Sequence, residues 1–196
     1  MLFNANDLAQ LGADEESNDS VTSLIGSLSF SGGEADIRKQ QAKQLIEKLP
    51  THEGLLPFTS VGRFSLHELL LAFVEKDGAS DVIASTYSIS EQPVRAIRDY
   101  FESGLINSFA LLIDARFPIR KPKVAQFIAE FATLGYANCH AKILVMKSKT
   151  RSVTYVGSHN LTAAHRLESG CLFVGTAIAD FYGEQLLTKI NENLYT

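Results

Sequence analysis

A histidine and a lysine two residues apart, His140 and Lys142, open the segment of this chain that is richest in reactive side chains. In a regular strand over residues 138–146 both would point to one face, because side chains alternate across a strand. A lysine on that otherwise apolar face is costly unless it meets an anion. If the strand begins instead at Ile143, both side chains lie in solvent.

A second polar group, Gly157, Ser158 and Asn160, follows directly after a predicted strand at 153–156. Glycine permits a tight turn, and Ser158 or Asn160 can cap a short helical turn whose free N–H groups favour an anion. Alone, this is an ordinary strand-to-helix turn. Pairing of 153–156 with 143–146 through a hairpin would gather an imidazole, an ammonium, a hydroxyl and a carboxamide, which together suit a phosphate.

The two stretches together resemble the HKD motif of the phospholipase D superfamily, an H-x-K followed by G-S-x-N. Glu168 fits the acidic residue usually found after that motif. The resemblance covers roughly residues 64–196 and includes the order strand, helix, strand upstream of the motif. The sequence departs from the pattern at Lys147, where the family has an aspartate, and nine rather than six residues separate that position from Gly157.

The resemblance implies a metal-independent phosphodiesterase that needs no cofactor. Family enzymes use two motifs and this sequence has one, so the resemblance implies a homodimer with a composite site. His140 of one subunit would attack phosphorus, and His140 of the other would protonate the leaving oxygen and then activate water. Lys142 from both subunits would neutralise the phosphoryl oxygens. Asn160 and Ser158 would donate hydrogen bonds there, and Glu168 would orient the imidazole.

The charge is unevenly distributed along the chain. The net charge is −4, but residues 1–94 hold 6 basic and 14 acidic side chains, residues 95–167 hold 11 and 4, and residues 168–196 hold 1 and 4. A basic middle suits a polyanion such as nucleic acid, although scattered lysines and arginines also coat ordinary solvated faces.

Four further residues are candidates for substrate binding. Tyr87 and Ser88 end a predicted strand at 81–88, and open α/β sheets commonly bind ligands at the carboxyl ends of their strands. Arg116 and Arg120 belong to a basic loop after the next predicted strand, at 108–113. That loop contacts a phosphate backbone or is simply solvated.

We therefore expect a DNA-cleaving endonuclease that works through a phosphohistidine. One alternative is a catalytically degenerate phospholipase D-like protein that binds nucleic acid or another protein, which Lys147 and the acidic N-terminal third favour. A third possibility is a phospholipase or phosphatidyl transferase, because fold and motif do not determine the substrate.

The composition, with 45% apolar and 20% charged residues, is ordinary for a globular protein. Helices are predicted at 35–49, 64–74, 91–101, 124–134 and 178–193, and strands at 81–88, 108–113, 138–146, 153–156 and 170–174. This order predicts an α/β fold, a mixed β-sheet flanked by helices, with a helical or irregular N-terminal extension. We expect an acidic extension at residues 1–60 and the phospholipase D-like domain at 61–196.

No apolar run is long enough to span a membrane, and the first residues lack the pattern of a secretory signal. The two cysteines, Cys139 and Cys171, make neither a disulfide framework nor a zinc site. We therefore expect a cytoplasmic protein without membrane insertion, and Cys139 as a small core residue.

Overall fold

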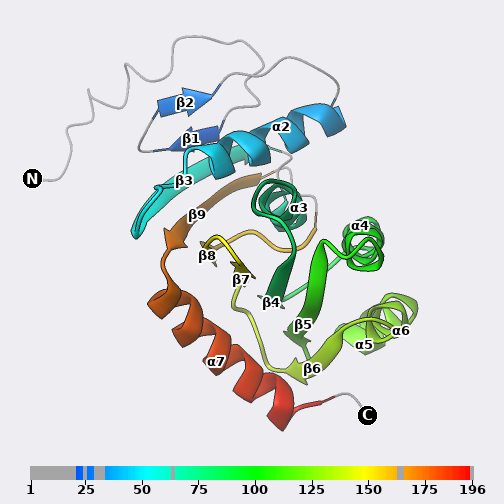
Figure 1. Cartoon of the computed structure of the whole chain (residues 1–196). Coiled ribbons are helices and arrows are strands. Elements are labelled where there is room, and N and C mark those ends of the chain that lie inside the picture. Colours follow the sequence, from blue (N-terminus) through cyan, green and yellow to red (C-terminus); the bar gives the residue numbers. More distant parts are fainter. Residues whose placement is uncertain (1–20, 24–25, 29–33, 63–64, 163–165, 195–196) are drawn as a thin grey trace, which may run out of the picture.

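The computed structural model describes residues 21–23, 26–28, 34–62, 65–162 and 166–194. Within them one sheet has the strand order β2-β1-β3-β9-β8-β7-β4-β5-β6 (Figure 1). The strands are β1 Val21–Ser23, β2 Gly26–Leu28, β3 Gly54–Gly62, β4 Ser80–Thr86, β5 Ile106–Asp114, β6 Thr133–Ala137, β7 Ile143–Ser148, β8 Ser152–Gly157 and β9 Arg166–Val174. The helices are α2 Glu34–Glu47, α3 Leu66–Asp77, α4 Glu91–Glu102, α5 Phe117–Arg120, α6 Pro122–Ala129 and α7 Thr176–Glu192.

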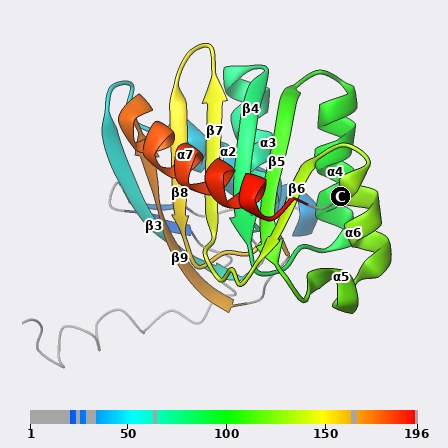
Figure 2. The ribbon, with the colours of Figure 1, turned by 90° about the horizontal axis from the view of Figure 1, so that it is seen from below.

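The sheet is mixed, as predicted. Strands β4, β5 and β6 are parallel, and the crossovers between them contain α4 and α6. All other pairings are antiparallel. Helix α7 crosses one face of the sheet, and α2, α3, α4 and α6 cover the other (Figure 2). The predicted α/β class is therefore confirmed.

Apolar side chains fill both spaces between the sheet and its helices. On the side of α3 and α4, Leu111 and Ile113 of β5 join the larger core. On the side of α7, Ala110 and Leu112 of the same strand join a smaller core, which also contains Cys139. A strand covered on both faces needs apolar residues at nearly every position. The continuous apolar run of β5 and the core placement of Cys139 are thus confirmed.

Strand β3 has no counterpart among the predicted elements. It pairs along its whole length with β9, and the proposed boundary between residues 60 and 61 falls inside it. Pro57 lowers the strand propensity of this segment, because proline cannot donate to a ladder. Only Phe58, Thr59 and Ser60 pair with β1, so the proline lies outside the stretch that has strands on both sides.

The helix predicted at 124–134 is too long, because its last residues belong to strand β6. The helix α6 ends at Ala129, and residues 133–137 pair in parallel with β5. Gly135, expected to end the helix, lies inside the strand. A Cβ atom there would lie 2.8 Å from Ile190 Cα in α7. The glycine therefore allows α7 to cross β6 closely, a tertiary requirement that helical periodicity does not reveal.

The predicted hairpin is confirmed, with Ile143 opposite Val156 and Met146 opposite Val153. The strand β7 begins at Ile143, however, and not at Asn138. His140 and Lys142 therefore lie in the segment that leads into β7, and strand alternation does not determine where they point.

No helix among the described residues is long and apolar enough to cross a membrane.

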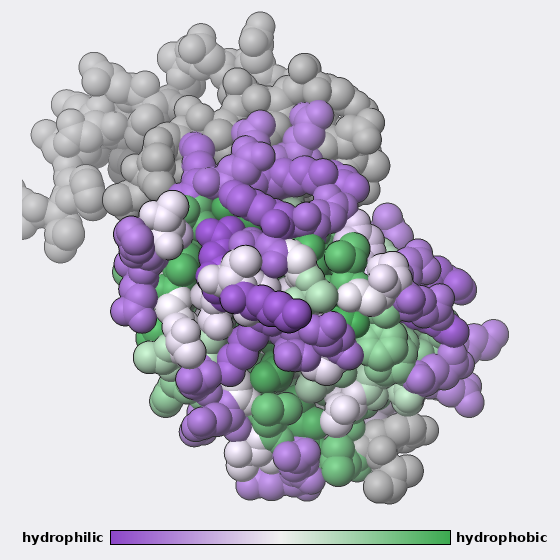
Figure 3. Space-filling model, viewed as in Figure 1, coloured by the Kyte–Doolittle hydropathy of each residue, from purple (hydrophilic) through white to green (hydrophobic). Residues whose placement is uncertain are grey.

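On the face viewed in Figure 3, hydrophilic side chains gather over α2 and α4. Helix α4 carries exposed ion pairs there, including Arg95 with Glu91 and Arg98 with Glu102.

Candidate active site

The candidate site lies at one edge of the sheet, where β4 and β8 end and where β7 and β9 begin. In Figure 2 this is the lower edge. Two backbone contacts join the loops that follow β4 and β8. Ile89 forms a bridge with Leu161, and the Ser90 N–H donates to the Leu161 carbonyl oxygen at 3.2 Å. The sheet order therefore brings segments about 75 residues apart into one site.

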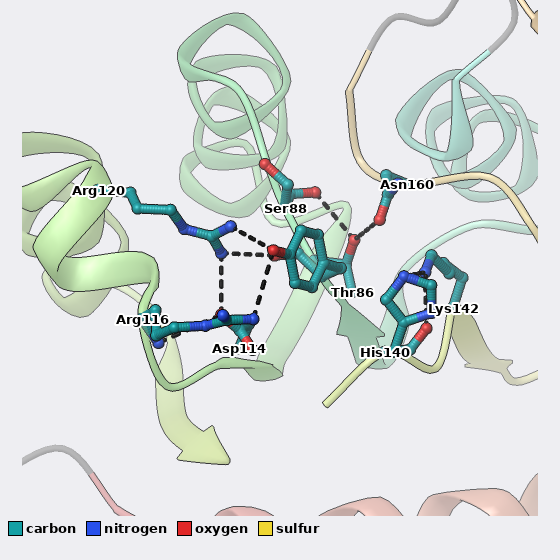
Figure 4. Close-up of polar contacts among 9 residues, drawn as sticks. Thr86, Ser88, Asp114, Arg116, Arg120, His140, Lys142 and Asn160 are labelled. Atoms are coloured by element: carbon teal, nitrogen blue, oxygen red, sulfur yellow. Dashed lines mark hydrogen bonds and ion pairs between the residues drawn. The ribbon is translucent and has the colours of Figure 1, made fainter. Parts of the chain in front are cut away.

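His140 and Lys142 lie against each other at this edge (Figure 4). The Lys142 Nζ atom is 3.0 Å from His140 Nδ1 and 3.1 Å from Nε2, and it donates to the His140 carbonyl oxygen at 2.7 Å. The ammonium of Lys142 therefore lies against the imidazole of His140, close to both of its ring nitrogens.

The two side chains differ in exposure. His140 is exposed, whereas Lys142 is only 7% exposed. Burial lowers the pKa of Lys142, and the nearby Cys139 and Glu168 act in the opposite direction. Among the residues that the structure describes, no carboxylate forms an ion pair with Lys142. A buried ammonium in this position is well suited to an incoming anion.

An open pocket of about 440 Å³ adjoins this pair. Its lining includes His140, Lys142 and Ser158, together with Tyr182 from α7. Tyr182 lies in the helix predicted at 178–193, and the sequence contains no signal of its contribution to the pocket.

Ser158 and Glu168 contact each other across the ends of β8 and β9. The Ser158 hydroxyl donates to the Glu168 carboxylate and accepts from the Ser169 N–H at 3.0 Å. Glu168 therefore holds the serine within this chain, whereas the resemblance predicted that it orients His140. The structure brings Ser158, Glu168, His140 and Lys142 to the same edge.

Asn160 is held from β4 by Thr86, a residue that sequence reasoning missed. The Thr86 hydroxyl is 3.2 Å from Asn160 Oδ1 and 2.9 Å from the Ser88 carbonyl oxygen, and it accepts from the Leu161 N–H at 3.4 Å. Contact through Oδ1 leaves the amide nitrogen of Asn160 turned away from Thr86. The signal was present in principle, because Thr86 lies near the carboxyl end of the strand predicted at 81–88.

His159 is buried and structural. Its Nε2 is 2.7 Å from Ser60 Oγ on β3, and its Nδ1 is 2.7 Å from the Tyr155 hydroxyl. Desolvation lowers its pKa from the usual 6.5 to about 4. The residue therefore ties the turn that carries Ser158 and Asn160 to strand β3.

This burial makes stability pH-dependent. In the unfolded chain His159 is protonated below about pH 6.5, whereas in the folded chain it is protonated only below about pH 4. The free energy of unfolding therefore falls as the pH drops between those two values. Between pH 7 and pH 5 the loss from this group should be about 2 kcal/mol. Urea unfolding of wild type and His159→Gln at both pH values measures it. Equal pH dependence in the two proteins would contradict the assignment.

Lys147, at the position of the family's aspartate, lies away from the pocket. Its Nζ is 2.6 Å from Asp180 Oδ1 on α7. It follows Lys142 by five residues, roughly 16 Å along a strand. The extra residues of the motif spacing form the hairpin tip, where the Ser148 N–H donates to the Arg151 carbonyl oxygen at 3.0 Å.

The four predicted binding residues surround the same edge. The Tyr87 ring lies 5.2 Å from the His140 ring, centroid to centroid, and Ser88 contributes its carbonyl oxygen to Thr86. Arg116 and Arg120 both contact the buried Asp114, a residue that sequence reasoning did not single out. In the part of the chain that the structure describes, no cluster of His, Cys, Asp and Glu is suited to a metal ion.

No family model and no curated protein matches this sequence. Solved structures do match its fold. NucT from Helicobacter pylori has a TM-score of 0.51 at 14% identity, covering 65% of this chain and 88% of that chain. Phosphatidylserine synthase from Haemophilus influenzae Rd KW20 has a TM-score of 0.54 at 11% identity, covering 87% and 49%. Nuc from Salmonella typhimurium, a phospholipase D family member, has a TM-score of 0.49 at 17% identity, covering 71% and 98%. The likenesses to NucT and to phosphatidylserine synthase show that the chain shares the fold of these two proteins.

Proposed function

We propose that the protein is a metal-independent phosphodiesterase that cleaves DNA through a phosphohistidine intermediate. One observation carries the proposal. The buried ammonium of Lys142, which has no carboxylate ion pair among the described residues, lies at hydrogen-bond distance from the exposed imidazole of His140, on an open pocket. This combination presents a nucleophile and a fixed positive charge to a phosphodiester.

The chemistry proceeds in two displacements. A ring nitrogen of His140 forms a bond to phosphorus, and the bond from phosphorus to the leaving oxygen breaks. A second histidine gives its proton to that oxygen. The same histidine then takes a proton from water, whose oxygen displaces His140 from phosphorus. Lys142 stabilises the charge on the equatorial oxygens in both steps.

The second histidine comes, in this proposal, from a second copy of the chain. Among the histidines that the structure describes, only His140 lines the pocket. His159 is buried and bonded to Ser60 and Tyr155, so its imidazole is committed elsewhere. A two-fold axis through the pocket would bring two His140 side chains to one phosphorus.

Asn160 and Ser158 have different roles in the proposed reaction. Among the described residues none accepts from the amide nitrogen of Asn160, whose amide oxygen contacts Thr86, so this nitrogen can donate to a phosphoryl oxygen. The Ser158 hydroxyl already donates to Glu168, so the serine acts by fixing the end of β8. Lys147, which replaces the aspartate, pairs with Asp180 and is not among the residues that line the pocket, which weakens the alternative of a degenerate binding protein.

DNA cleavage in excess EDTA tests the proposal. Wild type, His140→Ala and His52→Ala would be compared on single-stranded and double-stranded substrates. His52 is an exposed histidine in the segment before β3 and serves as the matched control. We expect cleavage by wild type and His52→Ala that persists in the chelator and is abolished in His140→Ala. Cleavage that requires a metal, or that survives in His140→Ala, would contradict the mechanism. Cleavage of phosphatidyl esters but not DNA would assign the site to lipids.

A further inference from the structure

Two arginines and a buried carboxylate form a cluster beside the catalytic pair. Asp114, at the end of β5, is 2% exposed. Its Oδ1 atom accepts from Arg116 Nε at 3.2 Å, from Arg120 at 3.0 Å and from the Arg116 backbone N–H at 3.3 Å. Two guanidinium groups share one carboxylate, so the cluster carries a net charge of +1.

Tyr87 connects this cluster to the pocket. Arg120 lies over its ring at 4.5 Å and donates to its hydroxyl at 2.7 Å, while Arg116 reaches the same hydroxyl at 3.5 Å. His140 lies against the same ring at 5.2 Å. The Arg120 guanidinium is therefore within about 10 Å of the His140 imidazole. In Figure 4, Arg116 and Arg120 lie on one side of the residues drawn, and His140 and Lys142 lie on the other side.

Both guanidinium groups remain accessible to a ligand. The side chain of Arg116 is 68% exposed and that of Arg120 is 37% exposed. Among the described residues, none accepts from Arg116 Nη1 or Arg120 Nε. The buried carboxylate orients both groups, so the geometry is organised before a ligand arrives. Guanidinium groups held in this way match the oxygens of a phosphate.

We propose that Arg116 and Arg120 form a second phosphate subsite, which binds a phosphodiester adjacent to the one that reacts at His140. This inference rests on the proposed function and specifies its substrate as a nucleic acid strand. A DNA strand carries one phosphate per 3.4 Å of helix axis, so neighbouring phosphates fall within the distance between His140 and the arginines. A substrate with a single phosphodiester would leave the subsite empty.

The test compares two substrates in EDTA. One is bis(p-nitrophenyl) phosphate, which has a single phosphodiester, and the other is a fluorescein-labelled 12-nucleotide DNA strand. Arg116→Gln should lower kcat/KM on the oligonucleotide roughly tenfold, because a charge-assisted contact is lost. The same variant should leave kcat/KM on the small diester unchanged. Arg98→Gln, which removes the same charge from the exposed face of α4, should change neither value.

Binding provides a second readout that does not depend on catalysis. Anisotropy of the labelled strand, titrated with His140→Ala at several salt concentrations, gives the slope of log Kd against log salt. Adding Arg116→Gln should reduce that slope by about 0.7. If wild type hydrolyses neither substrate but the slope changes, the proposed function fails and the subsite stands. Equal losses on both substrates, no binding of the strand, or a slope change matched by Arg98→Gln would each overturn the subsite.

Discussion

A heterodimer of one wild-type chain and one His140→Ala chain should lose roughly 10²–10⁴-fold of the phosphodiesterase activity of the wild-type dimer. The reason lies in the proposed composite site. A single His140 can attack phosphorus, but no second imidazole then protonates the leaving oxygen or activates water. A dimer with two independent sites would instead retain half of its activity.

Two affinity tags, one on each chain type, allow the heterodimer to be isolated from co-expressed subunits. Its activity on DNA in EDTA would be compared with that of both tagged homodimers. The matched control is a heterodimer of wild type and His52→Ala, which should be fully active because His52 is exposed and far along the chain from the motif. Half activity in the His140→Ala heterodimer would rule out the composite site.

Replacing either Gly157 or Gly170 by alanine should destabilise the fold by about 3 kcal/mol, at the upper end of the usual cost of overpacking. The two glycines face each other across β8 and β9, and the Tyr155 ring packs against both. A Cβ on Gly157 would lie 2.1 Å from the Tyr155 hydroxyl and 2.5 Å from the Ser169 carbonyl oxygen. A Cβ on Gly170 would lie 2.2 Å from Tyr155 Cε2. Overpacking of this kind shifts backbone and costs 1–3 kcal/mol or more.

Urea unfolding of both variants measures this loss, and Gly183→Ala provides the matched control. Gly183 lies in α7, where a Cβ would meet the flexible end of Ile83 at 3.3 Å. Alanine favours a helix by about 1 kcal/mol over glycine, so the control should be neutral or more stable. Unchanged stability of Gly157→Ala would contradict the packing described here. A loss of stability would also show that Gly157 is required because a side chain has no room there, since its φ is not in the left-handed region.

Local patterns predicted much of the fold. Helices α2, α3, α4 and α7 and strands β4, β5 and β8 agree with predicted segments to within a few residues, because each carries its own periodicity or apolar run. Strands β3 and β6 were missed because their local sequences lack a clear strand pattern. Pro57 weakens the first, and the second carries Gly135, whose role depends on the crossing of α7.

The candidate site divides in the same way. Residue types and the predicted hairpin grouped His140 and Lys142 with Ser158 and Asn160 as side chains suited to a phosphate, and the family resemblance added Glu168. Sequence also indicated the basic character of the segment that holds Arg116 and Arg120.

Only the tertiary structure decided the partners of these groups. Thr86 meets Asn160, which lies 74 residues away in the chain. Glu168 meets Ser158 across the paired strands β8 and β9, and Asp114 holds two arginines that follow it by two and six residues. Sequence spacing encodes the face on which a side chain lies, whereas the order of strands in a sheet is set by packing of the whole core. The contacts that orient the candidate catalytic groups depend on that order. The sequence pattern therefore identified the groups but not the residues that hold them in place.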